Sequence, residues 1–346
     1  MEINNQPKNL QELNCVAIGG GNGLATLLSG LKKFVGQGPS DDGPRIKMLS
    51  AIVAVSDDGG SSGRLRDELR MPPPGDIRSC MVALSEDSNL LSKLFQYRFG
   101  GDGQLGGHNF GNLFLAALSE ITGDFAEAVK LSSEILASKG HIYPATVSDV
   151  RLAAELHDGS VVRGETKVGI VGNAIKRLYL EPRDCQPLPE ALTAISEADV
   201  ITIGPGSLFT SLLPPLLVQD VSAAIAESSA VKIFICNLMT QPGETDGLNA
   251  RGHLEIVHQY APEVEFDFLV VNNHPIRDRQ RELYKHEGAE QIGVHGSISG
   301  NTIEAADIVY DNLLEEADKV RHSPDKVAKT VLRCAMTPSK SKTVSL

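Results

Sequence analysis

The sequence lacks several features that would assign the protein to a familiar class. No apolar run approaches the length that spans a bilayer, and the polar residues 1–13 contain no apolar stretch of the secretory type. Positive charge is scarce as well, because 32 Lys and Arg residues face 44 Asp and Glu residues, for a formal net charge of −12. These gaps predict a cytoplasmic protein whose main partner is neither a nucleic acid nor a membrane.

Cysteine pairs and standard nucleotide motifs are missing too. The five cysteines are scattered and form no C-x-x-C pair, which excludes a zinc finger or a disulfide scaffold and favours a reducing compartment. The glycine run at 19–23 fits no register of G-x-G-x-x-G, and no Gly-Lys-Ser or Gly-Lys-Thr follows it. The sequence is therefore not that of a standard dinucleotide enzyme or a P-loop NTPase.

What the chain does have is an alternation of short apolar, β-branched runs with helical periodicity. Strand-like runs occur at 15–18, 46–55, 200–203, 233–237 and 266–272. This alternation predicts an α/β fold with a mostly parallel sheet covered on both faces. The length of 346 residues suits one large domain or two.

Two segments stand apart from this alternation. Residues 76–138 are helix-rich, and residues 152–163 alternate about an Asp158-Gly159 turn, which is a strong hairpin signal. We expect both segments to be insertions in the sheet fold.

An acidic pair at the end of a predicted strand is the most informative motif. Asp57 and Asp58 follow the run 46–55, and adjacent carboxylates suit a ribose hydroxyl, a metal ion such as magnesium or a proton to be removed. The alternative is a solvated turn. The next residues supply backbone amides, hydroxyls and a guanidinium that suit a phosphate: Gly60, Ser61, Ser62 and Arg64.

Two further loops follow predicted strands and open helices. Their amides and helix dipoles favour an anion or nucleotide, whereas a tight structural turn is the alternative for the first. The residue two positions after Ser207 is Phe209 rather than glycine, so Ser207 is a binder and not the nucleophile of an elbow. The candidate binding residues are Gly20, Gly21, Asn22, Gly23, Gly204, Gly206 and Ser207.

Other polar residues are candidates for a sugar or acceptor pocket. Asp76 is either a plain N-cap or a ligand contact, and Arg78 follows it. His108, a third candidate catalytic residue beside Asp57 and Asp58, lies among glycines and amides that resemble a pocket wall. The remaining candidates, which could also belong to structural loops, are Asn109, Asn112, Asn237, Thr240 and Glu244.

Seven of these motifs, taken in order over residues 15–272, resemble the gluconeogenesis factor family. They are the segments 19–23, 57–64, 74–78, 97–99, 107–112, 204–211 and 241–245. The family belongs to the CofD-like superfamily, named for 2-phospho-L-lactate transferase. Asn22 departs from the family pattern, which usually has Thr there, but it keeps a hydrogen-bonding side chain.

The resemblance implies a Rossmann-like, doubly wound domain. We expect this single domain to span 14–337, with flexible ends at 1–13 and 338–346. It implies a cytoplasmic bacterial protein with a role in cell shape and growth on gluconeogenic carbon sources, binding a nucleotide sugar such as UDP-N-acetylglucosamine. The transferase branch moves a phospholactyl group onto a deazaflavin with a guanine nucleotide and a divalent metal. Its acceptor-binding Asp maps onto Asp57 or Asp58.

Three functional classes remain open: a nucleotide-sugar-binding regulator without turnover, a transferase of phosphorus-containing groups, and an NAD-dependent oxidoreductase. In a transferase, Arg64, Arg66 or Arg78 would offset phosphate charge. The missing third glycine disfavours the oxidoreductase. The transferase branch usually lacks the extension 59–64 that this chain has, which favours the regulator. No cofactor is predicted apart from magnesium as an option, and a homodimer is expected.

Overall fold

A computed structural model describes residues 12–36, 44–86, 90–293, 302–303 and 306–337. The predicted flexible ends lie outside these ranges, except that Glu12 and Leu13 begin the first strand.

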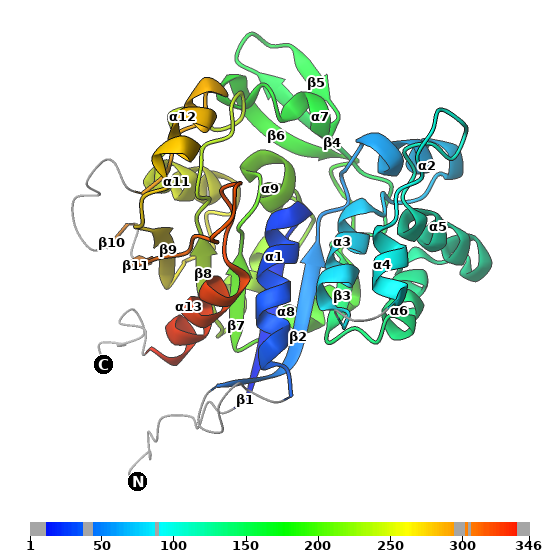
Figure 1. Cartoon of the computed structure of the whole chain (residues 1–346), viewed down its shortest axis with the longest axis horizontal. Helices are drawn as coiled ribbons and strands as arrows, with labels where there is room; N and C mark the ends of the chain where they lie inside the picture. Colours follow the sequence, from blue (N-terminus) through cyan, green and yellow to red (C-terminus); the bar gives the residue numbers. More distant parts are fainter. Residues whose placement is uncertain (1–11, 37–43, 87–89, 294–301, 304–305, 338–346) are drawn as a thin grey trace.

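The centre of the molecule is an eight-stranded sheet with the order β10-β11-β9-β8-β7-β1-β2-β3 (Figure 1). Every neighbouring pair is parallel except β10 and β11. The strands are β1 (Glu12–Gly19), β2 (Arg45–Val53), β3 (His141–Pro144), β7 (Val200–Ile203), β8 (Val231–Ile235), β9 (Phe268–Asn272), β10 (Thr302–Ile303) and β11 (Ala306–Asp311). From β1 the chain builds outward in one direction to β3 and then restarts at β7, so the predicted doubly wound α/β fold is confirmed.

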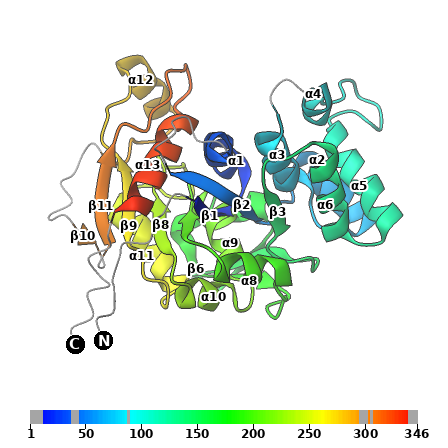
Figure 2. The ribbon, with the colours of Figure 1, turned by 90° about the horizontal axis from the view of Figure 1, so that it is seen from below.

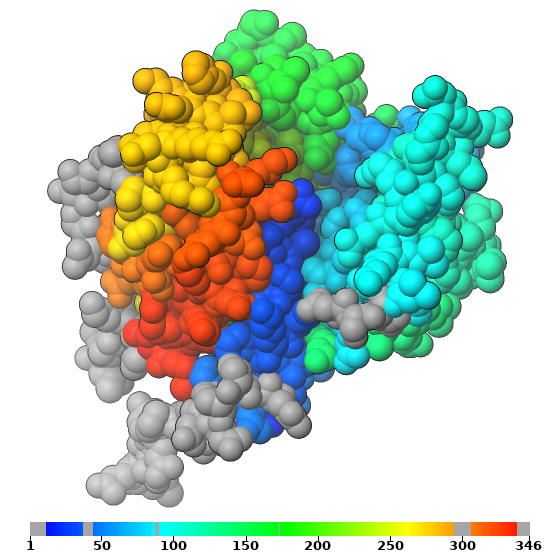
Figure 3. All heavy atoms as spheres, viewed as in Figure 1, coloured from blue at the N-terminus to red at the C-terminus, as the bar shows by residue number. Residues whose placement is uncertain are grey.

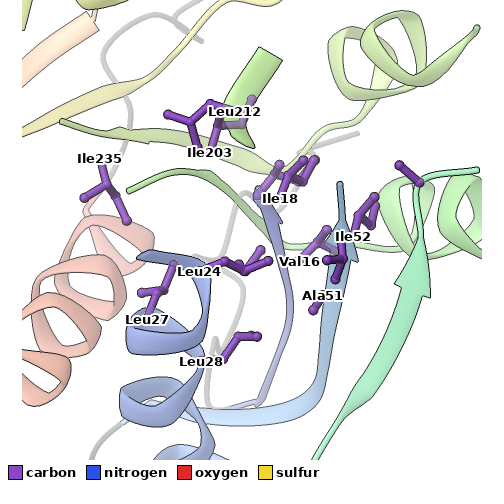
Figure 4. Packing of buried hydrophobic residues seen from close by; sticks show 14 of the residues in the cluster. Val16, Ile18, Leu24, Leu27, Leu28, Ala51, Ile52, Ile203, Leu212 and Ile235 are labelled. Atoms are coloured by element: carbon purple, nitrogen blue, oxygen red, sulfur yellow. The ribbon is translucent and has the colours of Figure 1, made fainter. Parts of the chain in front are cut away.

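Buried β-branched residues explain why the central strands form. Ile18 of β1 lies in register with Ile52 of β2 on one side and Ile203 of β7 on the other, and all three are fully buried. Figure 4 shows Leu24 and Leu28 of the first helix on the side that faces β1 and β2. Such continuous burial on both faces is typical of parallel strands between helices.

Helices cover both faces of the sheet (Figure 2). Two of them, α1 (Gly21–Leu31) and α13 (Pro324–Met336), lie on one face. On the opposite face are α8 (Pro189–Ser196), α9 (Leu213–Leu216), α10 (Val221–Glu227) and α11 (Ala250–Tyr260). The remaining elements of this part are α12 (Asp278–His286), the 3-10 helix η1 (Lys32–Phe34) and the π-helix η3 (Leu208–Leu212).

Two segments lie outside the alternation of the central sheet. The helix-rich stretch lies between β2 and β3 and contains α2 (Gly60–Leu69), α3 (Gly75–Leu84), α4 (Leu90–Gln96), α5 (Phe110–Thr122) and α6 (Phe125–Ile135). The predicted hairpin, β4 (Arg151–Leu156) and β5 (Val161–Arg163), is joined by a strand that the sequence did not reveal, β6 (Ile175–Glu181), in the order β5-β4-β6. Between β5 and β6 lie α7 (Glu165–Val168) and the 3-10 helix η2 (Gly172–Ala174).

The helices within the described residues have at most 13 residues. None of the helices there is by itself long and apolar enough to cross a bilayer, although the bent pair Leu208–Leu216 and Val221–Glu227 passes the test of length and composition together.

Candidate functional site

The predicted binding loops meet at the carboxyl edge of the sheet, where the strand order reverses between β1 and β7. A Cβ atom placed on Gly23 would overlap the carbonyl oxygen of Pro205 and lie 2.7 Å from its carbonyl carbon. The loops after β1 and β7 therefore touch through their backbones. We call the region around this junction of the two loops the crevice. Doubly wound folds bind their ligands at such a reversal of strand order.

The loops themselves are short. After β2 and β1, α2 already begins at Gly60 and α1 at Gly21. Gly59 and Gly20 have extended backbone conformations at the two N-cap positions. The strand-to-helix turns are consequently tight, and Ser61 and Ser62 are buried inside α2.

The predicted pocket wall on α5 is assembled around Ser61. The Ser61 Oγ atom lies 3.0 Å from Nδ1 of His108 and accepts a hydrogen bond from Nδ2 of Asn112 at 3.2 Å. Asn109 caps α5 through its own side chain. Burial first, and then the charge of Arg64, lowers the pKa of His108. These contacts join α2 to α5, so the cluster has a structural use whether or not it also binds a ligand.

Three helix N-termini at this edge are each capped by a carboxylate from a distant segment. The Gly21 amide of α1 donates to Asp76 at 2.8 Å, and the Thr166 amide of α7 donates to Asp58 at 3.0 Å. The Phe209 amide of η3 donates to Glu244 at 3.0 Å. Acids are stabilised at helix N-termini by the exposed amides and the helix dipole. Three acids that we predicted as ligand contacts, Asp58, Asp76 and Glu244, therefore already bind helix N-termini of the protein itself.

This pattern corrects one interpretation of Asp76. The residue is not the N-cap of its own helix, because α3 begins at Gly75 and Pro74 occupies its N-cap position. Asp76, on α3, instead binds the start of α1. An anion at the Gly21 amide would therefore have to displace a carboxylate of the protein.

The loops after β7 and β8 are held together by the side chains that we expected to contact a sugar. Asn237 accepts from the Gly206 amide at 3.0 Å and donates to its carbonyl oxygen at 2.7 Å. Ser207 donates to Glu244 at 2.5 Å, and Thr240 accepts from the Glu290 amide at 2.8 Å. Their role toward a sugar stays a prediction.

The sequence analysis missed one carboxylate of this edge, Glu165, the first residue of α7. Burial, followed by the charges of Asp76, Asp57, Asp58 and Glu244, raises its pKa to about 9. Glu165 is therefore protonated at neutral pH and can donate a hydrogen bond. No motif in the sequence surrounds this residue, so only the folded insertion reveals it.

Asp76 and Glu244 are shifted in the same direction as Glu165. Burial and then the charge of Asp57 raise the pKa of Asp76 to about 6, against the opposing hydrogen bond from Gly21. Burial likewise raises the pKa of Glu244.

The three candidate arginines have different surroundings. Arg64 donates to the Gly106 carbonyl oxygen at 2.8 Å. Arg66, 2% exposed, is bound by Asp149 and by the Val150 carbonyl oxygen. Arg78 donates to Asn112 at 3.0 Å, and burial followed by the charge of Arg98 lowers its pKa. Of the three, only Arg78 lines the cavity described next.

A cavity of about 450 Å³ lies beside the start of α1. Figure 3 shows α1, in blue, between the orange C-terminal segment and the cyan helices of the insertion. Asn22, Gly23 and Arg78 line the cavity as candidates from the sequence, whereas Arg321 and His322 were not anticipated. Its other lining residues are Ala25, Thr26, Ser29, Ser79, Val82, Ala83 and Gln96.

The two unanticipated residues differ in character. Arg321 is exposed, and its side chain has no acidic partner within the described ranges. His322 is 8% exposed, and burial lowers its pKa to about 4, so its ring is neutral. Its Nε2 atom has no hydrogen-bond partner. The cavity thus combines an exposed arginine, Arg321, with a neutral histidine, His322.

The proposed metal ligands have other partners as well. Asp57 accepts from the Gly59 amide at 2.8 Å, and one oxygen of Asp58 accepts from both the amide and the hydroxyl of Thr166. In the part of the chain that the structure describes, no group of three or more His, Cys, Asp or Glu side chains could hold a metal ion. A magnesium ion bound by one carboxylate and ligand phosphates stays a prediction.

Comparison with known proteins places this geometry in a family. The family described as 2-phospho-L-lactate transferase CofD matches residues 15–314. The chain belongs to the CofD family. Within it, this CofD-family chain is 43% identical to the gluconeogenesis factor of Halalkalibacterium halodurans, over 93% of this chain and 97% of that protein. It is 42% identical to the gluconeogenesis factor of Bacillus subtilis, over 92% and 96%.

A solved structure agrees with these relatives. The crystal structure of a Bacillus halodurans protein has a TM-score of 0.84 and 43% identity to the CofD-family chain, covering 93% of this chain and 99% of that one. The expected resemblance to the gluconeogenesis factors is therefore confirmed.

Proposed function

We propose that the protein binds a nucleotide sugar, UDP-N-acetylglucosamine or a close relative, and regulates cell morphogenesis during gluconeogenic growth without turning its ligand over. The observation that carries the proposal is the 450 Å³ cavity, which brings Arg78 and Arg321 to the start of α1 at Asn22 and Gly23. The names of the relatives support the gluconeogenic context.

The chemistry of the cavity suits a diphosphate joined to a sugar. Helix N-termini bind phosphates through free amides, and guanidinium groups pair with phosphate oxygens in a bidentate manner. The hydroxyls of Thr26 and Ser29 and the amide of Gln96 line the same space and can meet sugar hydroxyls. The volume lies within the usual range for small-molecule sites, about 300–1,000 Å³.

A second candidate function is transfer of a phosphorus-containing group, and Glu165 favours it. A protonated Glu165 beside Asp57 and Asp76 offers a proton donor near potential acceptors. Asp57 is the residue that would join ligand phosphates in holding magnesium, whose charge would stabilise the transferred group. We favour the regulator because Asp58, Asp76 and Glu244 already cap helices.

UDP-N-acetylglucosamine should raise the melting temperature of the protein, because a ligand bound only by the folded state stabilises it. At a hundredfold excess over the dissociation constant the gain is about 2.7 kcal/mol. Arg321→Gln should reduce the affinity by about tenfold with the fold intact. The control is Arg279→Gln, another exposed arginine, on α12. A shift with NAD and none with any UDP-sugar would reject the proposal.

Changing Asp57 and Asp58 together to Asn should lower the affinity for the nucleotide sugar by about tenfold or more, measured by calorimetry with magnesium present. Charged hydrogen bonds contribute about 1.5–3 kcal/mol each. Stability without ligand should hold or rise, because crowded like charges near Glu165 are relieved and Asn can still accept from Thr166. Asp102→Asn is the exposed control. Unchanged affinity in the double variant would remove the acidic pair from the site.

Purified protein given guanine nucleotide, phospholactate, deazaflavin and magnesium should form no product above background. The reason is that the segment 59–64 forms the N-cap and first turn of α2 rather than an open loop. The measurement is product formation by chromatography. Turnover at about one per second or faster would establish the transferase instead.

A further inference from the structure

A second cavity, of about 420 Å³, lies away from the crevice, along β6 of the three-stranded sheet. Because the strand order is β5-β4-β6, β6 pairs with β4 along one edge only. Its other edge faces the C-terminal end of α11, where Gln259 and Tyr260 complete the cavity wall together with Leu217.

Three cations line this cavity in a protein whose net charge is −12. Lys176 is paired with Glu155 at 2.7 Å. Among the residues that the structure describes, Arg177 and Arg183 have no carboxylate within ion-pair distance. The hydrogen bond and charge of Lys176, followed by the charges of Arg177 and Arg183, lower the pKa of Glu155. The cavity therefore holds an excess of positive charge.

An aromatic ring orients one of these cations. The Arg183 guanidinium lies 4.3 Å from the centre of the Tyr179 ring, a cation–π contact that orients the planar group while leaving its N–H donors available. Burial raises the pKa of Tyr260, and the hydrogen bond from Leu178 and the charge of Arg177 oppose that shift. The Tyr260 hydroxyl accepts from the Leu178 amide at 2.9 Å, so its own proton remains free to donate to a ligand.

We propose that this β6 cavity is a second ligand site, which binds a small phosphorylated molecule through Arg177, Arg183 and the Tyr260 hydroxyl. Guanidinium groups bind phosphate oxygens in a bidentate manner, and a hydroxyl can donate a further hydrogen bond to them. The cavity volume is that of a small-molecule site. The site is separate from the crevice and does not depend on the function proposed for it.

An acidic peptide is the other anion that such a surface could attract. A peptide would add to β6 through main-chain hydrogen bonds along the open edge. The Tyr260 hydroxyl already occupies the Leu178 amide on that edge. The structure therefore favours a compact phosphate ligand over an extended chain.

The test is calorimetric titration of the full chain with inorganic pyrophosphate at low salt and at 0.15 M salt, where screening weakens exposed contacts. The double variant Arg177→Gln, Arg183→Gln should lose at least about tenfold in affinity for pyrophosphate. The matched control is Arg151→Gln with Arg163→Gln, which removes the same charge from β4 and β5 of the same sheet. The control should keep its affinity.

A second pair of variants separates the two cavities. Arg78→Gln with Arg321→Gln alters only the crevice and should leave pyrophosphate binding at β6 intact. Binding that is lost in this variant, or that persists when Arg177 and Arg183 are changed to Gln in the same variant, would overturn the proposal. So would an absence of pyrophosphate binding together with capture of poly-glutamate, which would assign the surface to an acidic protein segment. Circular dichroism of each variant checks that the fold is retained.

Discussion

Glu165→Gln should make the folded protein more stable at neutral pH, by about 2–3 kcal/mol at pH 7. Glu165 has a pKa of about 9 in the folded state against an ordinary value of 4.5. Between these values the folded state binds a proton that the unfolded state has released. The free energy of unfolding therefore falls as the pH rises through this window, at about 1.4 kcal/mol for each pH unit. Gln keeps the size and the hydrogen-bonding capacity of the protonated acid without this cost.

The pH dependence distinguishes this cause from a general gain in stability. The advantage of Glu165→Gln should vanish below about pH 4.5, grow up to about pH 9 and then level off. Urea denaturation at several pH values measures it. Glu120→Gln, at an exposed position of α5, is the control and should change little at any pH. A Glu165→Gln variant that is no more stable than the wild type at pH 8 would show that the carboxyl group is ionised there.

The sheet could be predicted from the sequence because its strands are encoded locally. Buried, β-branched runs such as 200–203 read as parallel strands in any context. The edge strand β3 was missed because its four residues, HIYP, include His, Tyr and Pro and are only partly buried, and β6 because it carries exposed charged residues. These strands are specified by their neighbours, β2 and β4, rather than by their own composition.

The candidate site was predictable only in part, for a different reason. The sequence shows which residues are unusual, but not which partners satisfy them. Asp76 and Glu244 stand out as acids near glycine loops, yet each is bound to the start of a helix that is distant in the sequence. Arg321 has no motif around it and enters the cavity because the segment before α13 returns beside α1. Such pairings arise only in the folded chain.

Gly23→Ala should destabilise the protein by about 3 kcal/mol and weaken binding of the nucleotide sugar. Gly23 lies in the first turn of α1, where alanine alone would favour the helix by about 0.5–1 kcal/mol. The added methyl group would instead overlap the Pro205 carbonyl oxygen and lie 3.0 Å from the Cα atom of Gly206. Both obstacles are backbone atoms, which cannot rotate away. Overpacking of this kind costs about 1–3 kcal/mol, and two backbone contacts place the cost at the upper end.

The sign of this effect is what tests the crevice. Gly100→Ala is the matched control, because a Cβ atom there meets nothing within 4 Å, and it should leave both stability and binding unchanged. If Gly23→Ala were as stable as that control, the loops after β1 and β7 would not be in contact. If it were unstable but bound the nucleotide sugar normally once folded, the contact between the two loops would serve packing and not ligand binding. Loss of both, measured by urea denaturation and calorimetry, is expected because the same backbone contact that closes the sheet edge also sets the position of the Asn22 and Gly23 amides.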